Sequence, residues 1–219
     1  MKPARMIAAF AGLLAFGSSP AETPAGDETP AKPEPGFVSI FNGKDLTGWE
    51  GNRKLWKVAD GKIVGDSPGI TRNEFLATKK RYHNFELRLE FRMKDGKGNS
   101  GVQFRSKRLP KSSAVQGYQA DIGARFWGCL YDEHRRRKVL ARAPASQSKV
   151  LKKGVWNTYV IRAKGNHVVM TVNGLKTVDY TERDKTVARK GILALQIHSG
   201  PPMRVEFRNI RIKVLADRP

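Results

Sequence analysis

Two short runs in the middle of the chain carry polar side chains at every second position. Gln103 and Arg105 alternate with apolar residues in the first run, and Gln119 and Asp121 do so in the second. Alternation with a period of two is typical of a β-strand with one face in the core, so the polar side chains should share the other face. Amides, a guanidinium and a carboxylate on one face are groups that bind sugar hydroxyls. The pattern therefore predicts a carbohydrate site.

Two further runs extend this predicted face. Trp127, Tyr131 and Glu133 share one parity, and Gln196 and His198 alternate with apolar residues in a later run. Aromatic rings stack on sugars, and carboxylates and imidazoles can act as acids and bases. The residues predicted to be catalytic are Asp121, Glu133 and His198, and those predicted to bind substrate are Arg105, Gln103, Gln119, Tyr131, Trp127 and Gln196.

Several of these residues have structural alternatives. Asp121 could cap a turn or pair with Arg105 or Arg125, and Asp132 and Glu133 could pair with the basic residues Arg135 to Arg137. His198 could be an ordinary histidine at a strand end. No cofactor is expected. A divalent metal held by Asp121, Glu133 and His198 stays open as an alternative, although no motif with metal-ligand spacing requires one.

The N-terminal residues predict export. Lys2 and Arg5 precede a short apolar run, and the small residues before and at Ala21 fit a cleavage site, so we expect a signal peptide over residues 1–21. Residues 22–35 are rich in Pro, Ala and Glu and are expected to be a disordered linker. The protein should then be periplasmic or secreted. No apolar run is long enough for an ordinary transmembrane helix.

The net charge bears on the binding partners, and the cysteine count bears on disulfides. The formal net charge of the 219-residue chain is +21, and removal of Lys2 and Arg5 with the signal peptide leaves +19. Such a surplus attracts polyanions, so an anionic glycan stays open as a substrate. Export and the lack of a nucleic-acid-binding motif argue against nucleic acid. Cys129 is the single cysteine, which excludes an intrachain disulfide, and we expect it to be a buried apolar residue.

The remaining pattern predicts an all-β domain. About a dozen short alternating runs are separated by turn dipeptides such as Asp60-Gly61, Gly165-Asn166 and Asn173-Gly174, and a bulge is expected near Asn209. No convincing helix is visible. We expect one β-sandwich of two antiparallel sheets over residues 36–216.

The order and spacing of several short motifs carry a family resemblance over roughly residues 36–215. They are the stretches FNGKDLTGW (41–49), WKVADG (56–61), NFEL (84–87), NSG (99–101), WN (156–157), NG (173–174), LQIH (195–198) and FRNI (207–210). With these motifs the chain resembles the bacterial 3-keto-disaccharide hydrolase domain family. The resemblance implies a jelly-roll sandwich of the concanavalin A-like lectin/glucanase type, with the ligand on a concave sheet.

The resemblance also implies a reaction. A ketone at sugar carbon 3 acidifies the hydrogen on carbon 2, so a base can remove it, the glycosidic oxygen leaves by elimination, and water then adds. In this chemistry Arg105 would hold the enolate oxygen or a sugar hydroxyl. Many family members carry a G-Y-E-x-Q pattern at the central strand, whereas this chain has an amide at Gln119 and a carboxylate at Asp121.

Two other functions stay open. The same scaffold could serve a non-catalytic, lectin-like carbohydrate-binding module, because a fold does not determine a function. The strongly basic chain could also be an envelope protein that binds polyanionic glycans. The sequence leaves the glycan, its linkage and the oligomeric state undetermined.

Overall fold

The computed structural model describes residues 34–123 and 125–217, all of them within the compact unit Ala31–Pro219. The predicted signal peptide and residues 22–33 of the predicted linker lie outside these described residues. Within the described residues there are fifteen strands, one 3-10 turn, Lys94–Gly96, and one short helix, α1 (Gln147–Val150). The expectation of an all-β fold is confirmed, because the single helix spans four residues.

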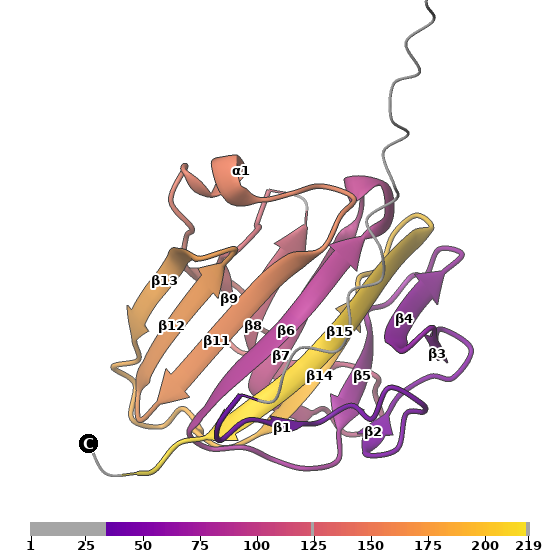
Figure 1. Cartoon of the computed structure of the whole chain (residues 1–219). Coiled ribbons are helices and arrows are strands. Elements are labelled where there is room, and N and C mark those ends of the chain that lie inside the picture. Colours follow the sequence, from indigo (N-terminus) through magenta and orange to yellow (C-terminus); the bar gives the residue numbers. More distant parts are fainter. Residues whose placement is uncertain (1–33, 124, 218–219) are drawn as a thin grey trace, which may run out of the picture. The chain divides into compact units, whose positions relative to one another are not determined.

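Eight strands form the first sheet, here sheet A, in the order β13-β12-β11-β6-β15-β4-β3, with β1 paired to β15. All of its pairs are antiparallel. Figure 1 shows sheet A in front of the second sheet. Its strands are β1 (Val38–Ser39), β3 (Trp56–Ala59), β4 (Lys62–Ser67), β6 (Phe85–Met93), β11 (Asn157–Lys164), β12 (His167–Val172), β13 (Leu175–Thr181) and β15 (Met203–Val214).

Seven strands form the second sheet, here sheet B, in the order β10-β9-β8-β7-β14-β5-β2. The neighbours β9, β8, β7 and β14 carry the runs in which the sequence predicts a site. The strands of sheet B are β2 (Trp49–Glu50), β5 (Glu74–Thr78), β7 (Asn99–Arg108), β8 (Val115–Gly123), β9 (Leu130–Glu133), β10 (Val139–Ala141) and β14 (Ile192–Ile197).

The core lies between the two sheets and follows from the period-two patterning. In β6 every second residue from Phe85 to Met93 is buried, and the residues between them are partly exposed. Val102, Phe104 and Tyr118 of sheet B belong to the same apolar cluster as the buried residues of β6. Burial of apolar surface at about 25 cal/mol per Å² is the main stabilising term for such a sandwich. The alternate residues of the sheet B strands point away from this core, so they can carry polar groups.

Most predicted turns occur where the dipeptides indicated them. Asp60-Gly61 joins β3 to β4, Gly165-Asn166 joins β11 to β12, and Asn173-Gly174 joins β12 to β13. The bulge expected near Asn209 is confirmed, because this residue has φ +52° and the register of β15 against β6 shifts between Arg208 and Arg211. The shift keeps Ile210 buried.

Arginines on the polar face of sheet A form ion pairs with glutamates on the same face. The Arg92 Nε–H donates to Glu206 Oε2 at 2.8 Å, and the Arg208 Nε–H donates to Glu90 Oε2 at 2.7 Å. Both guanidiniums lie over the Trp156 ring, 4.7 and 4.2 Å from its centroid. Arginines on this face are therefore compensated by nearby carboxylates. Among the described residues, no helix is long and apolar enough to cross a membrane.

Candidate active site on the outer face of sheet B

Strand register brings most of the predicted residues onto one face of sheet B. Gln103 of β7 lies opposite Gln119 of β8, and Gln119 lies opposite Tyr131 of β9. Asp121 and Glu133 share the parity of Gln119 and Tyr131 on their own strands. On the other side of β7, Gln103 lies opposite Ala194, so Gln196 shares this face too. The face points away from the core because the intervening residues Val102, Phe104, Tyr118 and Ala120 belong to the apolar cluster.

The site has a buried floor and a partly exposed rim. Gln103, Gln119, Asp121 and Gln196 are each at most 4% exposed. The rim residues are only half-buried, and they are Tyr131, Glu133 and His198. A polar floor beneath an accessible rim is the arrangement expected of a small-molecule site, in which a few polar groups orient the ligand.

A chain of hydrogen bonds runs along the floor and ends at Asp121. The Ser106 hydroxyl donates to Gln103 Oε1 at 3.0 Å, Gln103 Nε2 donates to Gln119 Oε1 at 2.6 Å, and Gln119 Nε2 donates to Asp121 Oδ1 at 2.6 Å. The direction of every bond is consistent, because a carboxylate oxygen can only accept. The chain thus fixes the orientation of both amides and of the carboxyl group.

Gly101 makes room for this chain. A Cβ atom at this position would lie 2.7 Å from Cγ and Cδ of Gln119, which is closer than side-chain atoms pack. Gly101 is the residue opposite Asp121 on β7. The glycine therefore leaves room for the Gln119 side chain, which lies against Gly101 and bonds to Gln103 and Asp121.

Within the part of the chain that the structure describes, four buried polar atoms on this face have no hydrogen-bond partner. They are Asp121 Oδ2, Asn99 Oδ1, and Nε2 and Oε1 of Gln196. An unpaired buried polar group costs about 1–3 kcal/mol, so native proteins rarely retain one without a role. Bound substrate hydroxyls or carbonyls would supply the missing partners. The cluster of unpaired atoms is therefore a candidate contact surface for a polar ligand.

Both carboxyl groups of the site have a raised pKa. Burial raises the pKa of Asp121 to about 7, the hydrogen bond from Gln119 opposes this rise, and the nearby negative charge of Glu133 adds to it. Burial also raises the pKa of Glu133, while His134, His198 and Arg137 oppose that rise. Among the described residues no cation pairs with Asp121. The alternative of a salt bridge to Arg105 or Arg125 is therefore wrong.

His198 completes the rim just after β14 ends. Its backbone N–H donates to the Asn99 carbonyl at 3.3 Å, which holds the residue beside the start of β7. Its Nδ1 lies 2.6 Å from the Ser199 carbonyl oxygen. Because a carbonyl only accepts, Nδ1 carries the proton, and Nε2 of the neutral ring is left as the basic atom.

The basic run after β9 is partly structural. Arg135 Nε donates to both oxygens of Asp132 at 2.9 and 3.0 Å, and Arg136 pairs with Asp132 and with Glu182. Asp132 is fully buried. The hypothesis that Asp132 pairs with this run is confirmed, whereas Glu133 lies 3.3 Å from His134 instead.

Two predicted site residues lie elsewhere. Arg105 is not on the site face, because β7 bulges between Phe104 and Lys107 and Arg105 itself has φ +49°. Its guanidinium donates to the carbonyls of His83 and Gly165 and to Asn84 Oδ1.

Trp127 is the second predicted site residue that does not lie on the site face. The third run was expected to be a strand from Trp127 onward, but β9 begins at Leu130, after a turn at Gly128 with φ +72°. The Trp127 ring is buried in the core and stacks on Phe91 at a centroid distance of 6.1 Å. It therefore offers no platform for a sugar. Cys129 is buried as expected, and burial raises the pKa of its thiol.

The structure adds two residues that sequence reasoning did not single out, Asn99 and Ser106. Asn99 shares the parity of Gly101 and Gln103 on β7, so the period-two pattern alone would have placed it on the site face. Ser106 follows the bulge and gives no such signal. Among the described residues, no group of three or more His, Cys, Asp or Glu that could hold a metal ion is found.

Comparisons with known proteins identify the family of the chain and its fold. The sequence model of the 3-keto-alpha-glucoside-1,2-lyase-like domain matches residues 36–213. A 3-keto-disaccharide hydrolase of Bacteroides thetaiotaomicron is 34% identical over 77 residues, which are 31% of this chain and 26% of that protein. The match thus spans about a quarter of the relative's length.

Solved structures show the same fold. A candidate glycosyl hydrolase from Parabacteroides distasonis has a TM-score of 0.64 at 25% identity, with 83% of this chain and 95% of that chain covered. The carbohydrate-binding module CBM66 from Bacillus subtilis has a TM-score of 0.59 at 18% identity, with 75% and 94% covered. A Bacillus subtilis protein with a galectin-like fold has a TM-score of 0.60 at 14% identity, with 79% and 92% covered. The jelly-roll sandwich is thereby confirmed.

These matches support a carbohydrate-active protein, and a hydrolase in general terms. The family match covers residues 36–213, which is most of the chain and contains every residue of the site face. The chain therefore belongs to the family of 3-keto-alpha-glucoside-1,2-lyase-like domains.

Proposed function

We propose that the protein cleaves 3-keto-glycosides by elimination followed by hydration, with Asp121 as the base. The observation that carries this proposal is the state of the Asp121 carboxyl group. It is 4% exposed, its Oδ1 is held by Gln119, its Oδ2 has no partner, and its pKa is raised to about 7. A general base works best when its pKa lies near the working pH.

The reaction would proceed in two balanced steps. Asp121 Oδ2 takes the hydrogen on carbon 2 as a proton, and the electron pair of that C–H bond forms an enolate with the carbon-3 carbonyl. The enolate then collapses, the bond from carbon 1 to the glycosidic oxygen breaks, and the leaving oxygen receives a proton. In the second step water adds at carbon 1 and a proton returns to carbon 2, which gives the free 3-keto sugar. Elimination alone corresponds to a lyase, and the sum of both steps is a hydrolysis.

Gln196 suits the role of donor to the developing enolate oxygen. Its amide is fully buried, and neither Nε2 nor Oε1 has a partner. A preorganised N–H donor in a dry site stabilises developing negative charge strongly. Because Arg105 lies away from this face, Gln196 takes over the role first expected of the arginine.

Glu133 suits the role of acid for the leaving oxygen. Burial raises the pKa of its carboxyl group, which increases the protonated fraction near neutral pH. His198 lies close enough to Glu133 to influence that pKa, and its free Nε2 can relay a proton or activate the water of the second step. Tyr131, half-buried beside Gln119, would contact the sugar ring. The export signal expected over residues 1–21 would place the reaction in the periplasm or outside the cell.

Sugar release from a 3-keto-disaccharide and from its unoxidised parent tests this function. We expect release from the keto form only, because only the ketone acidifies the hydrogen on carbon 2. The assay should be run with and without a chelator to reveal any metal requirement. Equal release from both sugars would contradict elimination chemistry. Saturable binding without release, across a panel of keto-sugars, would instead indicate a binding module.

A further inference from the structure

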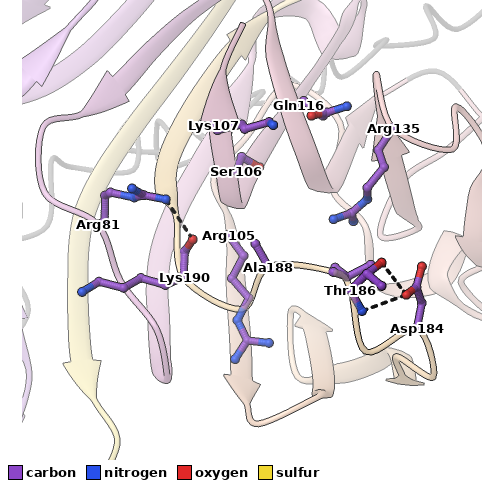
Figure 2. Close-up of a pocket in the computed structure, with 11 residues that line it drawn as sticks. Arg81, Arg105, Ser106, Lys107, Gln116, Arg135, Asp184, Thr186, Ala188 and Lys190 are labelled. Atoms are coloured by element: carbon purple, nitrogen blue, oxygen red, sulfur yellow. Dashed lines mark hydrogen bonds between the residues drawn. The ribbon is translucent and has the colours of Figure 1, made fainter.

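A second pocket lies toward the turn between β7 and β8, away from Asp121, and it shares Ser106 with the hydrogen-bond chain of the site. It has a volume of about 300 Å³ and is walled by the ends of β7 and β8 and by the segment between β13 and β14. Gln116 of its wall precedes Asp121 by five residues on β8, roughly 17 Å at about 3.3 Å per residue. Figure 2 shows the pocket. Its charged lining residues are Arg81, Arg105, Lys107, Arg135, Lys190 and Asp184.

Four of the five cations in this wall have no carboxylate partner among the described residues. Arg81 donates to the backbone carbonyl of Lys190 at 3.3 Å, and neither Lys107 nor Lys190 forms a side-chain ion pair there. On sheet A, by contrast, arginines such as Arg92 and Arg208 are each paired with a glutamate. Charge is therefore balanced on sheet A and left unbalanced around this pocket.

Arg105 is a buried cation of this wall that has no carboxylate beside it in the described part of the chain. Its side chain is 4% exposed, and its guanidinium donates only to neutral oxygens, those of His83, Gly165 and Asn84. Burial is the main cause that lowers the pKa of Arg105 to about 10; Tyr118 opposes this shift and the nearby charge of Arg189 adds to it. A buried cation without a counter-charge is unfavourable, and an anion placed nearby would relieve this cost.

Arg135 contributes from the opposite side of the pocket. In Figure 2 its side chain extends toward the segment that carries Thr186 and Ala188, while Arg81 and Lys190 lie on the other side. Its guanidinium lies over the Tyr118 ring, 4.6 Å from the centroid, and its Nη2 is buried without a partner. The one acidic residue of the lining, Asp184, accepts at Oδ1 from the backbone N–H and the hydroxyl of Thr186.

From this charge distribution we propose that the pocket binds a sulfate or phosphate group. Such a group is small enough for the volume and carries several oxygens that can accept from the guanidinium and ammonium groups of the wall. Arginine and lysine side chains are the usual protein ligands of such groups. The group could be a free inorganic anion or a substituent on a sugar, and the two sources share this chemistry.

Calorimetric titration of the full-length protein at fixed ionic strength tests the site. The probes are inorganic sulfate, inorganic phosphate and glucose 6-sulfate. We expect saturable 1:1 binding with a Kd below about 10 mM for at least one of them. A double variant, Arg81→Gln with Lys107→Gln, should weaken this binding at least tenfold. The matched control, Lys44→Gln with Lys153→Gln, removes two exposed charges outside the pocket and should change the Kd by less than twofold.

The comparison of probes identifies the source of the group. Inorganic anions that bind as tightly as glucose 6-sulfate would indicate a free anion, and tighter binding of the sulfated sugar would indicate a substituted glycan. Lys107→Glu, which places a carboxylate at the exposed edge of the pocket, should abolish binding while the thermal unfolding transition stays cooperative. Absence of saturable binding, or equal weakening in the two double variants, would overturn the proposal.

Discussion

Replacing Asp121 with asparagine should lower kcat for sugar release from a 3-keto-disaccharide by about a hundredfold to ten-thousandfold, the range that a positioned general base contributes. Asparagine keeps the shape of the side chain and still accepts the hydrogen bond from Gln119, but it has no basic oxygen. The rate would be measured under saturating substrate, beside binding of an unreactive analogue. We expect the variant to bind the analogue and to fold normally.

The matched control for this variant is Asp179→Asn. Asp179 lies on β13 of sheet A, where it pairs with His167 and Lys176 at half-exposed positions. The Asp179→Asn substitution should leave kcat unchanged within about twofold. Full activity of Asp121→Asn, with the control also active, would remove Asp121 from the role of base.

The same variant should become more stable than the wild type as pH rises from 4 to 7. The pKa of Asp121 is raised from 3.8 to about 7 in the folded state, chiefly by burial. The folded protein therefore holds a proton that the unfolded chain releases, and its unfolding free energy falls as pH rises through this window. At about 1.4 kcal/mol per pH unit, the loss reaches about 4 kcal/mol at pH 7 and above.

Urea unfolding at pH 4, 5.5, 7 and 8 measures this difference. The unfolding free energy of Asp121→Asn minus that of the wild type should be near zero at pH 4 and level off above pH 7. The variant lacks this titration, so a curve parallel to that of the wild type would show that Asp121 is not held in a desolvating site. Asp179→Asn should not reproduce the gain, because ion pairing lowers the pKa of Asp179 to about 2.

Alternation along single strands was enough to predict the site face. Gln103, Gln119, Asp121, Tyr131, Glu133 and Gln196 share that face because the side-chain period of a strand is two. The prediction failed where regular strand geometry ended. A bulge after Phe104 turned Arg105 away, and the turn at Gly128 placed Trp127 in the core.

Other features of the site depend on contacts between distant parts of the chain. The pairing of β7 with β14 brings Ala194 opposite Gln103 across about ninety residues and so places Gln196 on the same face, and no local pattern encodes which strands become neighbours. The unpaired state of Asp121 Oδ2 and of the Gln196 amide depends on side-chain packing. These atoms carry the proposed chemistry, so the structure was needed to choose among the predicted residues.

The expected loss of activity depends on one claim, that Asp121 removes the hydrogen on carbon 2. Incorporation of solvent deuterium tests it most directly. The reaction would be run in D₂O with a 3-keto-disaccharide, and the released 3-keto sugar would be analysed by mass spectrometry at early times. Samples without protein and with Asp121→Asn would correct for spontaneous exchange.

The account predicts one deuterium at carbon 2 in each sugar released by the wild-type protein, because the proton lost in elimination is replaced from solvent during hydration. Released sugar that retains its original hydrogen at carbon 2 would contradict it, because the glycosidic bond would then break without removal of that proton.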